Sequence, residues 1–217
     1  MTPARDHAIG SAARRISRDS APRQFIVDIG AAASRRHAIP AWFAADVTDV
    51  LPLLHGPHGG TITTYVVATV ARAVERQPRL HALLDLRRRV VTFESVDVTV
   101  SVEVDIDGQP FPMNHVLRGA QHRSVPDLQR ELHGVKATPR GSDTMRLAGS
   151  ARWFLLLPHA VRSRLLGSLR RLPDWQRSLV GTVGVTSVGM YGHGGGLGLP
   201  FLVHTLDVLI GGLERRP

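Results

Sequence analysis

Valine and polar residues alternate without a break over residues 96–105, VDVTVSVEVD. Successive side chains of a strand point to opposite sides of a sheet, so the valines would share one face and the polar residues the other. The stretch therefore predicts a strand with one buried face and one polar face. A sheet of this kind needs a second layer to cover its valines.

Two helices with apolar faces are predicted on either side of this strand. Over residues 61–77 one side carries Ile62, Tyr65, Val66, Thr69, Val70, Ala73 and Val74, and Pro78 ends the pattern. The second helix begins after Ser124, which is expected to cap it with Asp127 in a variant of the capping box. Its apolar face consists of Val125, Leu128, Leu132 and Val135.

The remaining elements are shorter. Strands are predicted over residues 39–47, 181–188 and 203–212, and a short helix is expected after Asp28 as its cap. Pro158 and Pro173 delimit two further helices, and the first, with Val161 and Leu165 on its apolar side, is expected to cover a core face. Strands and helices lack a regular βαβ rhythm, so we predict one α/β (α+β) domain with a mixed sheet flanked by helices.

The chain has 217 residues, 43% of them hydrophobic, which suffices for one large core over residues 25–217. Residues 1–24 are polar and arginine-rich and are predicted to form a basic arm. The sequence has no cysteine, no apolar run near the roughly 20 residues of a membrane span, and no secretory signal. We therefore expect a cytoplasmic protein without a membrane partner.

The formal net charge is +9, and Lys136 is the only lysine among the basic residues. A basic surface attracts anions, including nucleic acid, acidic lipid and coenzyme A. Aromatic residues make up only 5% of the chain and do not interleave with a basic stretch, so no nucleic-acid partner is expected.

Common catalytic motifs are missing from the sequence. The glycine-rich loop YGHGGGLGLP lacks the spacing of a dinucleotide or phosphate-binding loop. The eleven histidines form no compact ligand spacing, so no metal site is expected. Glu103, Asp105 and Asp107 are interpreted as the solvated face of a strand. The only H-x-x-x-D spacing, His81 to Asp85, is interpreted as a chance pairing.

The stretch GTVGVTSVGMYG, residues 181–192, resembles the segment G-T-F-T-I-S-N-L-G-M-F-G of the dihydrolipoamide acyltransferase catalytic domains. These domains are the cores of the 2-oxo acid dehydrogenase complexes and share their fold with chloramphenicol acetyltransferase. The identical positions are Gly181, Thr182, Gly189, Met190 and Gly192. Four weaker resemblances follow the family's order along the chain: RRHAIPAWFAADVTDVLPLL, TITTYVVATVARAVERQPRLHALLD, VDVTVSVEV and RSVPDLQREL.

The resemblance implies a specific chemistry. Family members are trimers with active sites between subunits, and a histidine in a C-terminal H-x-x-x-D-G motif deprotonates the thiol of coenzyme A or dihydrolipoamide. A hydroxyl at the position of Thr186 donates to the oxyanion of the tetrahedral intermediate. By the same resemblance, Ser187, Gly189, Tyr191 and His193 are the expected substrate-binding positions, and a coenzyme A thioester is the expected substrate, with no bound prosthetic group.

The sequence departs from the family at several points. Threonine and serine replace the family's serine and asparagine at positions 186 and 187, the connection between residues 136 and 181 is longer, and H-x-x-x-D-G and the lipoyl and subunit-binding segments do not occur in the chain. Three interpretations follow for the missing base: a core that is incomplete at its C-terminus, a non-catalytic trimeric scaffold, or a half-site whose histidine a partner chain supplies. An arginine-rich binding module is the alternative outside the family.

Overall fold

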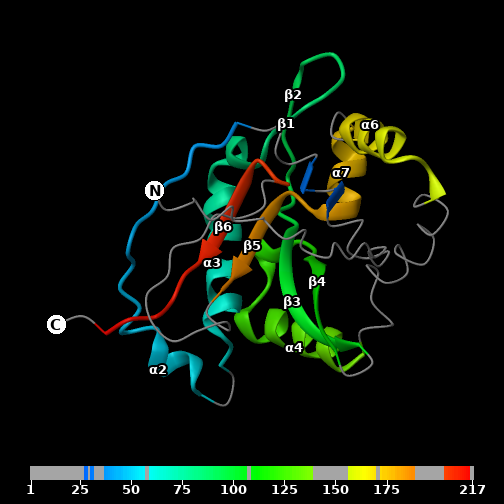
Figure 1. Ribbon diagram of the computed structural model, residues 1–217. Coiled ribbons are helices and arrows are strands. Elements are labelled where there is room, and N and C mark those ends of the chain that lie inside the picture. The colour runs from blue at the N-terminus through cyan, green and yellow to red at the C-terminus, as the bar shows by residue number, and fades with distance from the viewer. Residues whose placement is uncertain are drawn as a thin grey trace, which may run out of the picture.

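A computed structural model describes residues 27–28, 30–31, 37–56, 59–106, 109–138, 156–169, 172–188 and 203–215. Its centre is a mixed four-stranded sheet with the order β4-β3-β5-β6 (Figure 1). A separate two-stranded hairpin, β1 (Leu83–Leu84) with β2 (Val90–Val91), projects from the top of the molecule in that view. The expected mixed α/β architecture is confirmed; the predicted arm, residues 1–24, lies outside the described residues.

The strands follow the predicted alternation. β3 (Val98–Ile106) pairs antiparallel with β4 (Gln109–Leu117) along its whole length. On its other side β3 pairs parallel with β5 (Val183–Ser187), but only over Val98 to Val100. β5 in turn pairs parallel with β6 (Leu206–Ile210) along all five residues, with Thr186 opposite Leu209. The far end of β5 therefore has a strand partner on one side only.

Helices α3 (Ile62–Arg76) and α4 (Val125–Ala137) cover one face of the sheet (Figure 1). The hydroxyl of Thr61 accepts from the backbone of Thr64, whose side chain accepts from the Thr61 backbone, which is a full capping box. Ser124 caps α4 as predicted, since its hydroxyl accepts from the N–H of Asp127. These caps satisfy the free N–H groups of the first helical turns.

The core lies between this face of the sheet and the two helices. Its fully or nearly buried members include the four β3 valines, which are at most 4% exposed, and Val183 and Val185 of β5. Helix residues complete it, among them Val67, Ala71 and Val74 of α3 and Leu128 and Leu132 of α4. Burying one such side chain contributes roughly 1.5–3 kcal/mol to folding. The opposite face of the sheet is free to carry polar residues, as the alternation requires.

Smaller helices surround this centre. They are α2 (Leu51–Leu54), the 3-10 helices η1 (Pro78–His81) and η2 (Ala120–His122), and α6 (His159–Leu169) with α7 (Pro173–Val180). Pro158 and Pro173 stand at the starts of α6 and α7. None of the helices within the described ranges is long and apolar enough to cross a bilayer.

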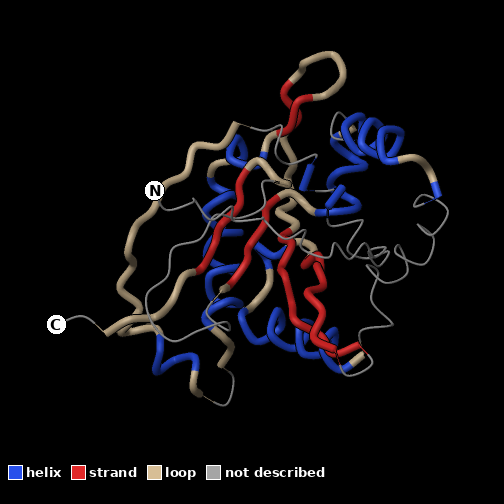
Figure 2. Tube along the Cα trace, in the orientation of Figure 1, coloured by secondary structure: helices blue, strands red, loops and turns tan. Residues whose placement is uncertain are grey.

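Three predictions of local structure were wrong. Helix α3 forms over the expected residues, but its buried side consists of Thr64, Val67, Ala68, Ala71 and Val74 and, apart from Val74, not of the predicted face, of which Thr69 and Ala73 are exposed. Residues 39–47 are extended but belong to no sheet, and Figure 2 draws them as loop. Helix α6 also departs from the expected orientation: Val161 and Leu165 are 43% and 42% exposed, whereas Arg162 is buried against Asp28 at 2.7 Å. The ion pair explains this orientation of the helix, because the buried carboxylate of Asp28 needs a positively charged partner, which Arg162 provides.

Gly184 provides a test of packing on the polar face. A Cβ at this position would lie 2.0 Å from Oδ1 of Asp207 and 2.6 Å from Nδ1 of His204. We expect Gly184→Ala to destabilise the protein by roughly 1–3 kcal/mol through overpacking. Gly134→Ala in α4 is the control, because a Cβ there meets nothing within 4 Å. It should instead stabilise the helix by about 0.5–1 kcal/mol. Urea denaturation of both variants measures the difference, and equal midpoints would contradict the expectation.

Candidate functional site

Thr186 lies near the end of β5 on the sheet face opposite α3 and α4. Val183 and Val185 point into the core, so Gly184 and Thr186 point to the other face. Ser187 shares the core-side direction of the two valines. Both hydroxyl residues are half-buried. Only Thr186 therefore presents its hydroxyl on the open, polar face.

The Thr186 hydroxyl differs from the other threonine hydroxyls near it. Thr99 on β3 donates to the carbonyl oxygen of Val180, and Thr182 is bonded to His81 and to the backbone of Asp97. Within the described part of the chain, the side chain of Thr186 has no hydrogen-bond partner, and neither has that of Ser187. A half-buried hydroxyl with no internal partner is available to an external group.

The start of β5 is fixed by Asp97, the residue before β3. The carbonyl oxygen of Asp97 accepts from the N–H groups of Thr182 at 2.7 Å and Val183 at 3.2 Å. Gly181 lies between this point and α7 with φ +70°. A Cβ at Gly181 would lie 2.6 Å from the same carbonyl oxygen, so the close approach of the two backbones requires glycine.

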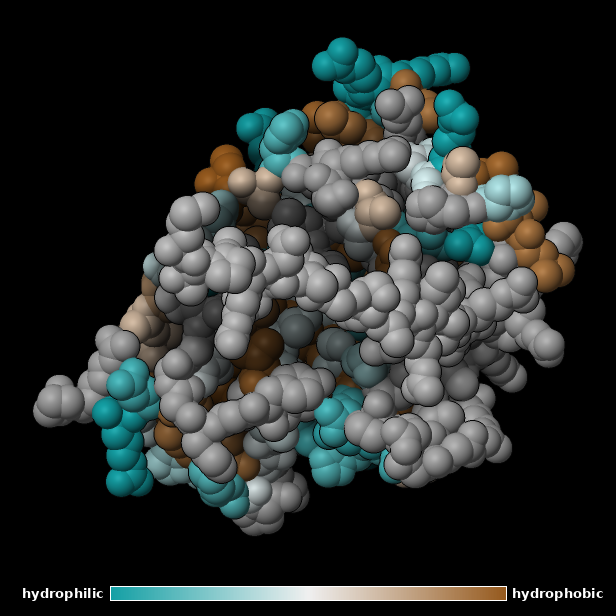
Figure 3. Space-filling view, in the orientation of Figure 1, coloured by the Kyte–Doolittle hydropathy of each residue, from teal (hydrophilic) through white to brown (hydrophobic). Residues whose placement is uncertain are grey.

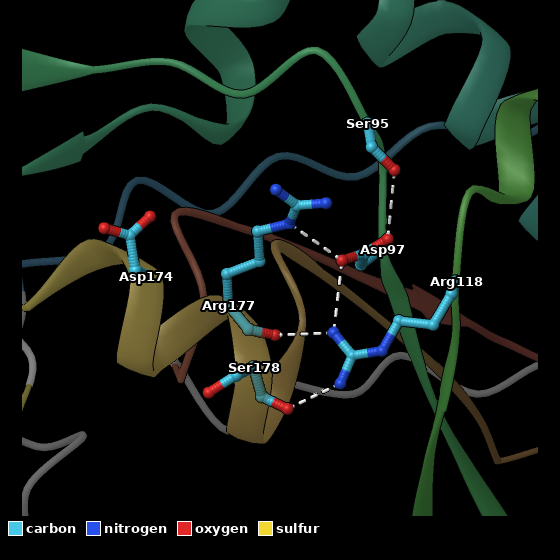
Figure 4. Close-up of a pocket in the computed structure, with 6 residues that line it drawn as sticks. All are labelled: Ser95, Asp97, Arg118, Asp174, Arg177 and Ser178. Atoms are coloured by element: carbon cyan, nitrogen blue, oxygen red, sulfur yellow. Dashed lines mark hydrogen bonds and ion pairs between the residues drawn. The ribbon is translucent and has the colours of Figure 1, made fainter.

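The side chain of Asp97 ties together several elements (Figure 4). Its carboxylate accepts from Arg118 at 3.1 Å, Arg177 at 2.9 Å, the Gly119 N–H at 3.0 Å and Ser95 at 3.2 Å. The guanidinium of Arg118 also donates to the carbonyl oxygens of Arg177 and Ser178 in the last turn of α7. Asp97 thus joins β3, the end of β4 and helix α7.

An open pocket of about 380 Å³ is lined by Ser95, Asp97, Arg118, Asp174, Arg177 and Ser178. Figure 4 shows these six side chains. Asp97 itself is 1% exposed. Burial raises the pKa of its carboxyl group, but the hydrogen bonds from Gly119, Arg177 and Arg118 outweigh burial and hold the pKa below its usual value. The carboxylate of Asp97 is fully engaged in this network, so in this pocket it acts as the centre of a structural ion cluster.

His81 and Asp85 do not form a pair. His81 is fully buried, with Nε2 at 3.2 Å from the Phe93 carbonyl oxygen and Nδ1 at 3.1 Å from the Thr182 hydroxyl. Asp85 accepts from the backbone of Arg87 and Arg89 and from the Arg89 side chain at the hairpin turn. Burial lowers the pKa of His81. Its neutral ring donates from Nε2 to Phe93 and accepts at Nδ1, which is a structural role.

A second histidine on the polar face was missed by the sequence analysis. His204 contacts Asp207 at 2.7 Å from Nδ1 to Oδ1, and its Nε2 faces the Val180 carbonyl oxygen. Asp207 is the neighbour of Gly184 across β5 and β6. Both ring nitrogens therefore face oxygen atoms of the protein, which holds the ring in place within the fold. The signal in the sequence was the H-x-x-D spacing at the start of a strand, where the side chain of Asp207 also accepts from the His204 N–H.

The remaining residues of the expected substrate-binding site lie outside the described ranges. Gly189, Tyr191 and His193 fall outside the described residues, so only Thr186 and Ser187 of the predicted site have a described position. In the described ranges, no three potential metal ligands cluster. Glu103 and Asp105 are exposed, as a solvated strand face requires, and Asp107 is outside the described residues.

No protein-family model and no curated protein matches the sequence itself. The structure, however, is similar to the truncated catalytic core of the 2-oxoacid dehydrogenase multienzyme complex from Thermoplasma acidophilum. The TM-score is 0.61 at 18% identity, over 93% of this chain and 82% of that one. A probable dihydrolipoamide acetyltransferase from Listeria monocytogenes gives a TM-score of 0.60 at 13% identity, over 96% and 78% of the two chains.

Dihydrolipoamide acetyltransferase from Azotobacter vinelandii gives a TM-score of 0.59 at 12% identity, over 94% of this chain and 74% of that one. That structure addresses the role of a serine, a histidine and an asparagine in the catalytic mechanism. At these identities the likeness establishes the fold. The resemblance inferred from residues 181–192 is therefore confirmed as a shared fold with acyltransferase catalytic cores.

The buried neutral His81 predicts a pH dependence of stability. Its folded pKa is lowered, so below the unfolded value of about 6.5 the unfolded chain binds a proton that the folded chain does not. Stability should therefore fall as the pH drops from 7.5 to 5.5. His81→Asn should be less stable at pH 7.5 but lose less on acidification. His122→Asn is the control, because that side chain is 72% exposed. The free energy of unfolding of the parent protein and of both variants is measured at pH 7.5 and pH 5.5. If all three proteins lose the same stability on acidification, the role assigned to His81 is wrong.

Proposed function

We propose that this chain is the core of a thioester-dependent acyltransferase that moves an acyl group between coenzyme A and a thiol or another acceptor. The observation that carries the proposal is the half-buried Thr186 hydroxyl, which lacks a partner within the described residues on the open face of an acyltransferase-type sheet. The neighbouring threonine hydroxyls are all engaged in the fold. The net charge of +9 further favours an anionic substrate such as coenzyme A.

In this proposal Thr186 acts on the oxyanion. A base takes the thiol proton of the acceptor, and the thiolate attacks the thioester carbonyl carbon to form a tetrahedral intermediate with a negative oxygen. Thr186 donates its hydroxyl proton in a hydrogen bond to that oxygen. The intermediate collapses, the carbon–sulfur bond to coenzyme A breaks, and the leaving thiolate takes up the proton from the base. A donor placed in advance for such an oxyanion contributes about 3 kcal/mol.

Neither His81 nor His204 is suited to act as the catalytic base. Both have each ring nitrogen within hydrogen-bonding distance of a protein oxygen, and both are buried. The half-site hypothesis therefore assigns the base to a partner chain, with Ser187, Gly189, Tyr191 and His193 contributing to the substrate-binding wall. The second candidate function is a non-catalytic scaffold. The same observation favours it, because His81 and His204 both have structural hydrogen bonds.

Assembly is part of the proposal. The structural relatives include the catalytic core of a multienzyme complex, which supports a homo-oligomer for this chain as well. We propose a trimer with threefold symmetry, in which the site lies between subunits.

The first test uses the 217-residue chain alone. Without a base, a thiol of pKa about 8.5 is mostly protonated at pH 7, and general-base catalysis is worth roughly 10²–10⁴-fold. We therefore expect negligible transfer of acetyl from acetyl-coenzyme A to dihydrolipoamide, measured by the appearance of free coenzyme A. Robust turnover that survives His81→Asn but is lost in His204→Asn would overturn the structural role assigned to His204.

The second test addresses Thr186 in an active assembly, with the chain combined with a partner that supplies the histidine. We expect Thr186→Ser to keep most of the rate, whereas Thr186→Ala and Thr186→Val lose roughly 10²–10³-fold in kcat with little change in folding. Ser187→Ala is the matched control, because the neighbouring hydroxyl points to the opposite face. If Thr186→Val turns over at the parent rate, or if Ser187→Ala is the damaging change, Thr186 is not the oxyanion donor.

A further inference from the structure

Two opposite charges on helix α7 face one pocket but do not pair with each other. Asp174 and Arg177 lie three residues apart on the helix, and both line the open pocket of about 380 Å³ (Figure 4). Side chains with this spacing are neighbours on a helix surface and commonly form an ion pair. Within the described residues, however, the side chain of Asp174 makes neither an ion pair nor a hydrogen bond. The pocket therefore presents an unpaired carboxylate beside an arginine.

The guanidinium of Arg177 is held in place by buried partners. Its Nε donates to the carboxylate of Asp97 at 2.9 Å. Its Cζ lies 5.4 Å from the centroid of the Phe93 ring, which is a cation–π distance. Asp97 is 1% exposed and Phe93 is 8% exposed. The orientation of the guanidinium is therefore set by the fold before any ligand binds.

The two terminal nitrogens of this guanidinium remain available. Nη1 and Nη2 of Arg177 make no hydrogen bond to any described residue, and Figure 4 shows them at the far end of the side chain, away from α7. Together their N–H groups form a planar fork that matches the two oxygens of a carboxylate. Arg118 differs, because its Nη atoms already donate to Asp97 and to carbonyl oxygens of α7.

The charges around the pocket favour one class of ligand. Two arginines and two aspartates line it, so their formal charges cancel. An anion without a positive group, such as inorganic phosphate, would be repelled on Arg177 by the nearby carboxylate of Asp174. A ligand that carries both a carboxylate and an ammonium group would place each charge beside a protein group of the opposite sign.

We propose that this pocket binds a small amino acid in its zwitterionic form. The ligand carboxylate accepts from Nη1 and Nη2 of Arg177, and the ligand ammonium group donates to the carboxylate of Asp174. The ligand thereby completes the ion pair that the two side chains do not form directly. Glycine and β-alanine are the simplest members of this class, and they differ in the separation of their two charges.

The pocket is separate from the site proposed for acyl transfer. Asp97 accepts from the backbone N–H of Thr182 at the start of β5, and Thr186 follows four residues later. At about 3.3 Å per residue, these two positions lie roughly 13 Å apart along the strand. Binding of an amino acid therefore does not depend on acyl transfer, and its test requires no enzymatic activity.

A titration of the isotope-labelled full chain by nuclear magnetic resonance tests the site. The Nε–H signal of Arg177 is the local probe. We expect glycine or β-alanine to shift it with a dissociation constant at least about fivefold lower than that of acetate, which carries the carboxylate alone. Methylamine, which carries the ammonium group alone, should bind at least as weakly as acetate. The proposal is wrong if acetate or inorganic phosphate binds as tightly as both amino acids.

Asp174→Asn separates the two charges of the ligand. Asp174 is exposed and has no partner among the described residues, so the variant should keep the circular dichroism of the parent. We expect the dissociation constant of the preferred amino acid to rise about fivefold, whereas acetate should bind at least as tightly as before, because the repelling carboxylate is gone. Asp49→Asn is the matched control, since this aspartate is also exposed but lies outside the pocket, and it should change neither value. Unchanged amino-acid binding in Asp174→Asn would overturn the proposal.

Arg177→Lys tests the other half of the site. Lysine keeps a positive charge near Asp97 but lacks the planar fork, so it is not an equivalent partner for a carboxylate. We expect binding of the amino acid and of acetate to weaken about tenfold or more, with the backbone N–H signal of Ser178 as the probe. A variant that binds glycine and β-alanine as the parent does would show that Arg177 does not hold the carboxylate, and the proposed site would then be wrong.

Discussion

The buried carboxylate of Asp97 is the interaction on which the arrangement of this fold depends. Through its side chain it holds Arg118 and Arg177, and through its backbone it holds the first residues of β5. A buried carboxylate is costly unless it is fully hydrogen-bonded, and here four donors surround it. Because the groups that bind Asp97 come from the end of β4, from α7 and from the start of β5, the interactions of Asp97 fix the position of all three elements relative to β3. The fixed end of β5 in turn determines where its far end, with Thr186, projects.

The two ends of β5 therefore differ in how many hydrogen bonds they make to the rest of the protein. At the start, Thr182 and Gly181 are locked by close backbone contacts and by the ring of His81. At the end, β3 has already diverged, and the Thr186 hydroxyl has no internal partner in the described chain. A donor for a transition-state charge must be held rigidly and yet remain unsatisfied in the resting protein. A strand anchored at one end and open at the other would meet both conditions, which is why the proposed role of Thr186 agrees with its position.

Local patterns predicted the parts of this fold that depend on short-range physics. The valine alternation of β3, the extent of helix α3 and the apolar face of α4 are properties of single segments, and the structure confirms them. The buried face of α3 is not the predicted one, because the surrounding sheet and loops decide which side of the helix is covered. Predictions failed where partners far apart in the sequence decide. Arg162 is buried because it forms an ion pair with Asp28, and Asp97 is buried because it is paired with two arginines. Residues 39–47 have no strand partner among the described residues. For the candidate site, Thr186 stays a prediction from the sequence. The sequence analysis did not single out His204 with Asp207, because the burial of this pair depends on the parallel pairing of β5 and β6.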